Sequence, residues 1–264
     1  MGSWARSGSI GHMDERTLVV GRRFRGPEVG GGTGNGGYVC GLVALAAGPG
    51  LRAVEIRRAA GVPLDRPLVV RVEKGEAVLS DDEGPIARTT SADLAVTVPA
   101  PPPLEVARRV STRFLERLES GERTHTFPEC FVCGHRRGSG DGLRVFVGPL
   151  EEPAGHVPGT WVGAWRPEAA FLDEAGRVRA EFVWSALDCP GGWAIAGPGN
   201  TGTLQVEILE PVDGRQELIV MGWPVATAAA RPGSRRRYAG TAVFDARGRL
   251  LARGAAIWVA PRTA

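Results

Sequence analysis

Two short segments of this 264-residue chain combine glycines with an aromatic residue where a helix is expected to begin. Asn35-Gly36-Gly37-Tyr38 precedes one run of small and apolar residues, and Gly191-Gly192-Trp193 begins another. The first amides of a helix have no partner within the helix, and the helix dipole favours negative charge there. Glycines let a ligand atom approach these amides closely. Both segments could therefore bind a carbonyl oxygen on which negative charge develops.

A single carboxylate accompanies only the second of these segments. Asp188 lies three residues before Gly191, whereas the corresponding position before the first segment is Thr33. A carboxylate in this place can activate a water molecule or attack a carbonyl carbon directly. It can equally cap the helix, because an Asp shortly before a Pro is typical of a helix start. Both interpretations of Asp188 stay open from the sequence.

The segments that follow the two predicted helix starts correspond in order. Residues 53–56 resemble residues 205–208, residues 66–70 resemble residues 216–220, and their apolar patterns predict strands. One helix followed by consecutive strands predicts an antiparallel sheet packed on that helix, and the repeated order predicts two such α+β units. Further strands are expected at Ala87–Val98, Ala239–Phe244 and Leu250–Val259, with a hairpin turn at 245–248.

A proline-rich segment separates the two predicted units. Residues 99–103 cannot continue a strand and predict a stiff linker. Residues 104–119 carry apolar side chains at helical spacing, which predicts a connecting helix packed on the outside. The predicted boundaries are 16–98 for the first unit, 99–121 for the linker and helix, and 122–261 for the second unit.

Three stretches together resemble the hotdog-fold thioesterases. Asn35-Gly36-Gly37-Tyr38 resembles the helix opening of double-hotdog thioesterases, with Asn where a His often stands. Residues 130–134 with Gly142-Leu143 resemble the opening segment of phenylacetate-pathway-like thioesterases. Residues 184–193 resemble the pre-helix loop and helix start of thioesterase-like members, and an Asp in a similar loop is catalytic in the hydroxybenzoyl-CoA branch. The paired Asp and His of the hydratases are absent from both halves. The resemblance implies two tandem hotdog domains, each with an antiparallel sheet wrapped around a central helix.

The resemblance also implies hydrolysis of an acyl thioester, with coenzyme A as part of the substrate and no separate cofactor. By analogy with hotdog dimers, whose sites lie between protomers, Asp188 is expected to face the first-half amides. Asp188 would act as general base or nucleophile, and Asn35 would be a polar catalytic partner that positions the reacting groups. The expected substrate-binding residues are Gly36, Gly37, Tyr38, Gly191, Gly192 and Trp193. Two alternatives are a non-catalytic acyl-ligand binding protein and a dehydratase or lyase on the same fold.

The most basic stretch of the chain includes Arg235 and Arg236, after a Pro-Gly turn. Guanidinium groups bind phosphates through paired hydrogen bonds, so these two arginines could hold the phosphates of coenzyme A. A solvated surface loop is the simpler interpretation.

Cys130 and Cys133, with His125 and His135 nearby, have half of the spacing of a zinc site. A second cysteine pair at the matching distance is missing, because Cys40 and Cys189 lie at the two helix starts. We therefore expect no metal, and we expect the cysteines to be small buried hydrophobes in a reducing compartment.

Composition argues against several other classes of protein. The net charge of +3 makes no strong case for nucleic-acid binding, and no apolar run reaches the ~20 residues that span a bilayer. Residues 1–13 lack the apolar stretch of a signal peptide and are expected to be an expression leader. We expect a cytoplasmic protein that binds a small acyl thioester, and the habit of hotdog proteins to pair makes a homodimer a further expectation.

Overall fold

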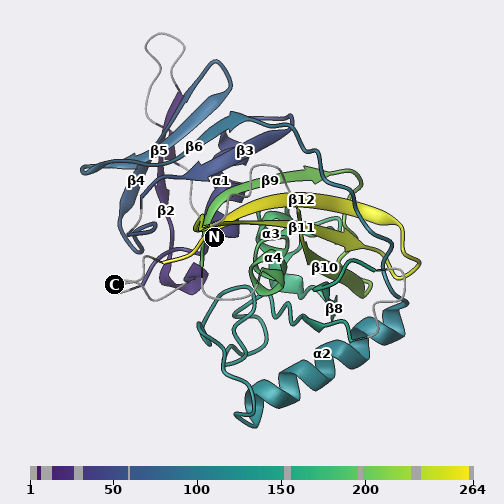
Figure 1. The fold of residues 1–264 in the computed structure, drawn as a ribbon. Helices are drawn as coiled ribbons and strands as arrows, with labels where there is room; N and C mark the ends of the chain where they lie inside the picture. The colour runs from purple at the N-terminus through teal and green to yellow at the C-terminus, as the bar shows by residue number, and fades with distance from the viewer. Residues whose placement is uncertain are drawn as a thin grey trace.

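A computed structural model of the chain describes residues 5–6, 14–26, 32–58, 60–151, 156–195, 199–226 and 233–261. The strands in these ranges join one sheet in which neighbouring strands run antiparallel. The sheet curves around a group of helices, and one longer helix lies outside it (Figure 1). In sheet order the strands are β1 (Ala5–Arg6), β2 (Asp14–Val19), β4 (Pro67–Glu73), β5 (Glu76–Asp81), β6 (Gly84–Ser91), β3 (Arg52–Ile56), β9 (Asn200–Ile208), β12 (Leu250–Val259), β11 (Arg236–Phe244), β10 (Leu218–Pro224), β8 (Trp161–Trp165) and β7 (Gly148–Pro149).

The first half holds the helix α1 (Gly36–Ala46) between β2 and β3 along the chain, after the short 3-10 turn η1 (Arg22–Phe24). Nearly all of α1 is apolar or small and buried, which is expected of a helix enclosed by a sheet. The side-chain oxygen of Asn35 caps its start by accepting a hydrogen bond from the Tyr38 amide at 2.9 Å. The helix predicted from the glycine-led segment is therefore confirmed.

The second half has the same order of elements. β8 is followed by the 3-10 turn η2 (Ala169–Phe171), by the helices α3 (Ala180–Ala186) and α4 (Cys189–Ala194), and then by β9 to β12. Apart from the two-residue edge strands, the two halves arrange their strands in the same way. The order in the sheet is β2-β4-β5-β6-β3 in the first half and β8-β10-β11-β12-β9 in the second half. In each case the second strand along the chain lies last. The halves join where the second strand of each, β3 and β9, pair with one another.

The start of the second-half helix differs from the prediction. Residues 184–190 were expected to form a loop before the helix, but α3 extends to Ala186 and a short break precedes α4. Pro190 has no amide hydrogen and its ring prevents a continuous helix, so the chain bends at Leu187 and Asp188. Residues 196–198, the end of the predicted glycine-led run, lie outside the described residues.

The end of the first half also differs from the prediction. β6 ends at Ser91, and residues 92–98 form no strand, although Leu94 and Val96 are buried. These two side chains join a hydrophobic cluster on the second half of the sheet, so the segment crosses between halves without a strand to pair with. The remaining strand predictions are confirmed at β3, β4, β9, β10, β11 and β12.

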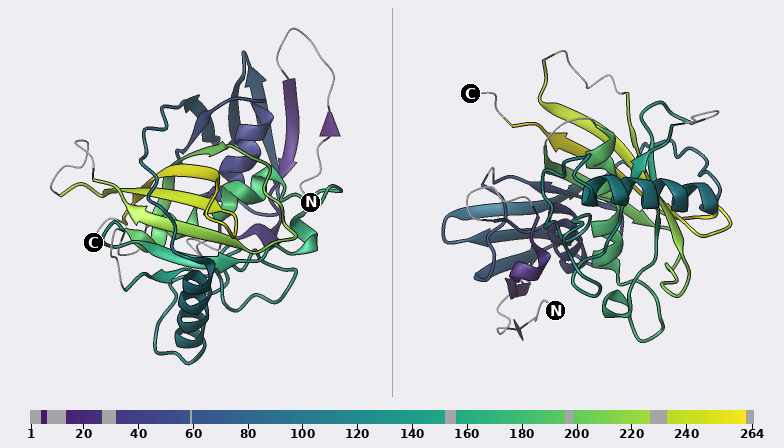
Figure 2. Two further views of the ribbon diagram at one scale, coloured as in Figure 1. Left: turned by 90° about the vertical axis from the view of Figure 1, so that its right-hand side faces the viewer. Right: turned by 90° about the horizontal axis from the view of Figure 1, so that it is seen from below.

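The connecting helix is α2 (Leu104–Glu119), with the predicted bounds. It packs on the outside of the sheet next to β8, well apart from α1 (Figure 2). The Ser111 hydroxyl anchors it by donating to the Phe146 carbonyl and accepting from the Ala164 amide, both at 2.8 Å.

Of the predicted leader, only Ala5 and Arg6 lie among the described residues, and their backbone pairs with β2. Within the described ranges, no helix has both the length and the apolar character that crossing a membrane requires.

Candidate active site

A cavity of about 1020 Å³ is lined by residues from both halves and from the loop that follows α2. The N-terminal end of α1 and the start of α4 both reach its wall. Much of the remaining wall is apolar and includes the side chains of Trp161, Trp193 and Trp258. An apolar cavity with a few polar groups gathered in one place is typical of a binding site for a small molecule.

Asp188 lies at the cavity wall, and its side chain joins the two halves. Its Oδ2 accepts a hydrogen bond from the Gly37 amide of α1 at 2.9 Å, and its Oδ1 accepts one from the Thr201 hydroxyl of β9 at 2.8 Å. The side chain makes no capping hydrogen bond to its own helix, α4. The carboxylate therefore binds the first turn of α1, the helix of the other half. The dipole of α1 favours negative charge at this end.

Burial changes the acidity of this carboxyl group. Asp188 is 1% exposed, and this desolvation raises its pKa to about 7. The hydrogen bonds from Thr201 and Gly37 stabilise the charged form and oppose the shift, but burial is the larger cause. A carboxyl group with this pKa can both take up and release a proton near neutral pH.

The two glycines at the start of α1 allow this close approach between the halves. A Cβ atom at Gly37 would lie 2.5 Å from the Asp188 Cβ, and one at Gly36 would lie 2.4 Å from the Thr201 Oγ1. Both distances are far below van der Waals contact, so any side chain at either position would push the carboxylate or its hydroxyl donor away. The glycines are thus needed so that the start of α1 can lie in direct contact with Asp188 and Thr201 of the other half.

The predicted roles of the α1 amides need correction. The Gly37 amide donates to Asp188 and the Tyr38 amide donates to Asn35, so neither is available to a ligand in this arrangement. The Tyr38 side chain is buried in the core, stacked on Phe24 with 4.1 Å between ring centroids, and does not line the cavity. Gly36 does line it, and its amide has no hydrogen-bond partner among the described residues.

Asn35 lines the cavity, but its side chain is already engaged. Its oxygen caps α1, and its Nδ2 lies 3.8 Å from the Cys130 Sγ as a hydrogen-bond donor. The structure therefore gives Asn35 a positioning role at the start of α1, and its predicted part in catalysis stays a prediction.

The start of α4 contributes two of its three predicted residues to the cavity. Gly192 and Trp193 line it, and the Trp193 ring stacks on Trp161 with centroids 5.2 Å apart. Gly191 instead packs against β11, where a Cβ atom would lie 3.1 Å from the Ala239 Cβ. The amides of Gly191 and Gly192 both donate to the Asp188 carbonyl, so they are not free to bind a ligand oxygen as predicted.

The two predicted arginines separate in the structure. Arg235 is exposed and lines the cavity, whereas Arg236 begins β11 and is not part of the cavity wall. Adjacent residues in an extended segment point to opposite sides, which explains why only one of them reaches the cavity.

No protein-family model matches this chain, and no curated protein matches it by sequence. Solved structures match it over nearly its whole length. A candidate thioesterase from Novosphingobium aromaticivorans DSM 12444 is 14% identical, with 94% of this chain and 96% of that chain covered and a TM-score of 0.59. The tesB protein of Mycobacterium avium subsp. paratuberculosis is 14% identical, with coverage of 97% and 95% and a TM-score of 0.57. A protein of unknown function with a hot dog fold from Alicyclobacillus acidocaldarius is 15% identical, with coverage of 98% and 97% and a TM-score of 0.52.

This chain has the hotdog fold. The resemblance expected from its glycine-led segments is confirmed at the level of the fold, as is the α+β class. At identities this low the likeness concerns the fold alone, so the chemistry of this hotdog protein has to be argued from its own cavity.

Several cavity residues of this hotdog protein were not predicted from the sequence. Thr201 and Arg123 line the cavity, and Arg123 stacks over the rings of Trp161 and Trp193 at 5.3 and 5.9 Å. No local pattern marks Thr201, because its hydroxyl meets Asp188 only when β9 folds back beside the start of α4. The charged and aromatic residues around Arg123 could have been noticed, but they follow the connecting helix and carry no recognisable motif.

Proposed function

We propose that this chain hydrolyses acyl thioesters in the cavity, and that esters of coenzyme A are its substrate class. The observation that carries the proposal is the position of Asp188, a buried carboxylate at the cavity wall between the helices of the two halves. The likeness to the candidate thioesterase and to the tesB protein supports the choice of reaction.

Thioester hydrolysis breaks a carbon–sulfur bond and adds water. In the general-base route, Asp188 takes a proton from a water molecule as its oxygen bonds to the carbonyl carbon. In the alternative route, the Asp188 oxygen attacks the carbon itself and water later releases the acyl group. In both routes the carbon–sulfur bond breaks and the departing thiolate takes up a proton. The products are a carboxylic acid and a thiol.

The carbonyl oxygen needs a hydrogen-bond donor as negative charge develops on it. Of the three amides predicted for this role at α1, Gly36 is the one that both lines the cavity and keeps its amide unpaired among the described residues. We therefore assign this role to Gly36. The helix dipole of α1 adds to the stabilisation.

We further infer that the two halves are two hotdog units, close to the predicted bounds 16–98 and 122–261, with the first unit running from β2 at Asp14 to the end of β6 at Ser91. The paired strands β3 and β9 support this duplication. The sequence comparison matched residue 53 to residue 205, and in the sheet Ala53 is paired with Gln205 itself. A residue that pairs with its own counterpart lies on a local two-fold axis, as in symmetric dimers.

The carboxylate is present in only one of these units. Thr33 stands at the position that corresponds to Asp188, and its hydroxyl holds the neighbouring loop by accepting from the Val62 amide at 2.5 Å. Thr33 cannot act as a base at neutral pH. We therefore propose one competent site in each chain.

Replacing Thr201 by Val removes one of the two donors to the Asp188 carboxylate and keeps the side-chain shape. A hydrogen bond to a charged group contributes about 1.5–3 kcal/mol, so we expect kcat to fall roughly 10- to 100-fold. Steady-state hydrolysis of an acyl-CoA measures this. Thr203→Val, on the same strand but outside the cavity wall, is the matched control. Equal rates for both variants would remove Thr201 from the proposed site.

Replacing Arg235 by Ala tests how the coenzyme is bound. Arg235 reaches the cavity and is exposed, so it can bind a phosphate at the mouth, and its loss should raise KM for acyl-CoA without lowering kcat. A thioester of N-acetylcysteamine, which lacks the phosphates, should show no change. Arg236→Ala is the control, and a rise in KM with that variant alone would contradict the assignment.

The proposal itself is tested by incubating the intact protein with acyl-CoA esters of increasing chain length and following free thiol with a chromogenic reagent. Release of thiol and acid supports the proposal. Saturable binding of the esters without thiol release would favour the acyl-ligand binding alternative. An enoyl product without free thiol would favour a lyase.

A further inference from the structure

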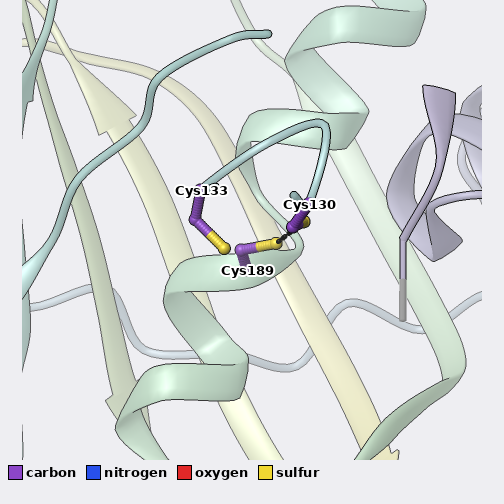
Figure 3. Close-up of side chains that lie close together, drawn as sticks. All are labelled: Cys130, Cys133 and Cys189. Carbon is purple, nitrogen blue, oxygen red and sulfur yellow. Dashed lines mark hydrogen bonds between the residues drawn. The ribbon is translucent and has the colours of Figure 1, made fainter. Parts of the chain in front are cut away.

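Three cysteines from two distant segments meet at the cavity wall. Cys130 and Cys133 lie in the loop after α2, and Cys189 is the first residue of α4. Their sulfur atoms point toward one another (Figure 3), and all three lie within 4.8 Å of one another. The three residues are buried, and none of them forms a disulfide.

The spacing of the sulfur atoms suits a metal ion. The Sγ atoms of Cys130 and Cys189 are 3.7 Å apart. Zinc binds thiolate sulfur at about 2.3 Å in tetrahedral geometry, which places neighbouring sulfurs about 3.8 Å apart. The other sulfur pairs lie within 4.8 Å, so a small movement of the side chains would let all three sulfurs bind one ion.

The loop that carries two of the cysteines is held in place by its backbone. The Gly134 amide donates to the Cys130 carbonyl at 2.9 Å, which closes a tight turn and turns both cysteines toward α4. A Cβ atom at Gly134 would lie 2.5 Å from that carbonyl oxygen, so the turn requires glycine.

The polar surroundings of the sulfurs are suited to negatively charged thiolates. The Asn35 Nδ2 lies 3.8 Å from the Cys130 Sγ and donates to it, as amides do around metal-bound thiolates. His125 is close by but is not available as a fourth ligand. Its Nδ1 accepts from the Phe127 amide at 2.9 Å, and its Nε2 lies 3.0 Å from the Cys133 carbonyl.

We propose that Cys130, Cys133 and Cys189 bind one zinc ion as thiolates, with the fourth coordination position facing the cavity that all three residues line. Sulfur ligands select zinc over magnesium and calcium, which prefer oxygen. The ion joins the loop after α2 to the start of α4, directly beside Asp188. This site replaces the expectation of no metal, and it does not depend on the proposed thioester hydrolysis.

The test counts zinc in the purified full-length protein by elemental mass spectrometry, after purification without chelator and with reductant. We expect about one zinc ion per chain in the unaltered protein and close to none in Cys130→Ala, Cys133→Ala and Cys189→Ala. Cys40→Ala is the matched control, because Cys40 is also buried but its sulfur lies 3.9 Å from the Val54 carbonyl, outside the cluster. It should keep the full zinc content.

A second measurement protects the test against variants that do not fold. The unaltered protein, stripped with a chelator, is titrated with Co²⁺, which replaces zinc and reports its ligands by absorption. Sulfur-to-cobalt bands in the near ultraviolet and strong tetrahedral bands in the visible, lost on adding Zn²⁺, are expected. Absence of zinc together with absence of these bands, or equal loss of zinc in Cys40→Ala, would overturn the proposal. Neither readout uses a substrate, so failure of the metal site and failure of hydrolysis are distinguishable.

Discussion

Replacing Asp188 by Asn should abolish nearly all thioester hydrolysis while leaving the protein folded. The amide cannot take up a proton from water or attack a carbonyl carbon, and loss of such a group lowers kcat by roughly 10²- to 10⁴-fold. The fold should tolerate the change because Asn can still accept from the Gly37 amide. Its NH2 group can donate to the Thr201 hydroxyl, which is able to reverse its role from donor to acceptor.

The measurement is the initial rate of thiol release at saturating acyl-CoA, together with KM and circular dichroism of the variant. We expect kcat to fall and KM to change little, because the acyl chain and the coenzyme contact other parts of the cavity. Asp93→Asn, at an exposed position in the irregular segment after β6, is the control and should be unchanged. An Asp188→Asn enzyme with the full rate would exclude both the general-base and the nucleophile role.

Replacing Gly37 by Ala should lower both stability and activity, although alanine usually stabilises a helix. Glycine within a helix costs about 1 kcal/mol relative to alanine, so propensity alone predicts a gain. The new methyl group would lie 2.5 Å from the Asp188 Cβ and 2.9 Å from the Ser185 Cα. The second contact is with backbone, which cannot move unless α3 moves. Overpacking of this kind costs about 1–3 kcal/mol.

Urea unfolding and the hydrolysis assay on the same preparation test this prediction. The free energy of unfolding should fall despite the higher helix propensity, and kcat should fall because the carboxylate is displaced from the wall. Gly138→Ala is the control, since no atom lies within 4 Å of a Cβ at that exposed position. A Gly37→Ala protein that is as stable and as active as the original would show that the two helices do not need this contact.

Both predictions concern one contact between the halves. The amide of Gly37 and the carboxylate of Asp188 are 151 residues apart in sequence, yet they form the hydrogen bond that joins α1 to the break before α4. In this arrangement the first turn of one helix is stabilised by a side chain from the other half. The proposed catalysis by Asp188 and the packing of the two halves therefore depend on the same few atoms.

The sequence by itself predicted α1, α2 and the strands β3, β4 and β9 to β12, but it did not predict β2, β5, β8 or α3. Helix α1 and the connecting helix follow from glycine, Asn35 and apolar spacing, which are local signals, and the two halves could be recognised because their segments occur in the same order. The proposed difference in chemistry between the halves also comes from the sequence, since a carboxylate precedes only one glycine-led segment.

The tertiary structure decided which of these residues meet. It turned the Tyr38 ring into the core, directed the Gly37 amide to Asp188 rather than to a ligand, and separated Arg235 from Arg236. It also brought Cys189 to Cys130 and Cys133. The spacing of Cys130 and Cys133 by itself had not predicted a metal site, because a second cysteine pair is missing from the sequence. The physical reason is common to all of these: hydrogen bonds, close packing and metal coordination act over a few ångströms between residues that the chain separates. Only the pairing of the two halves brings those residues within reach.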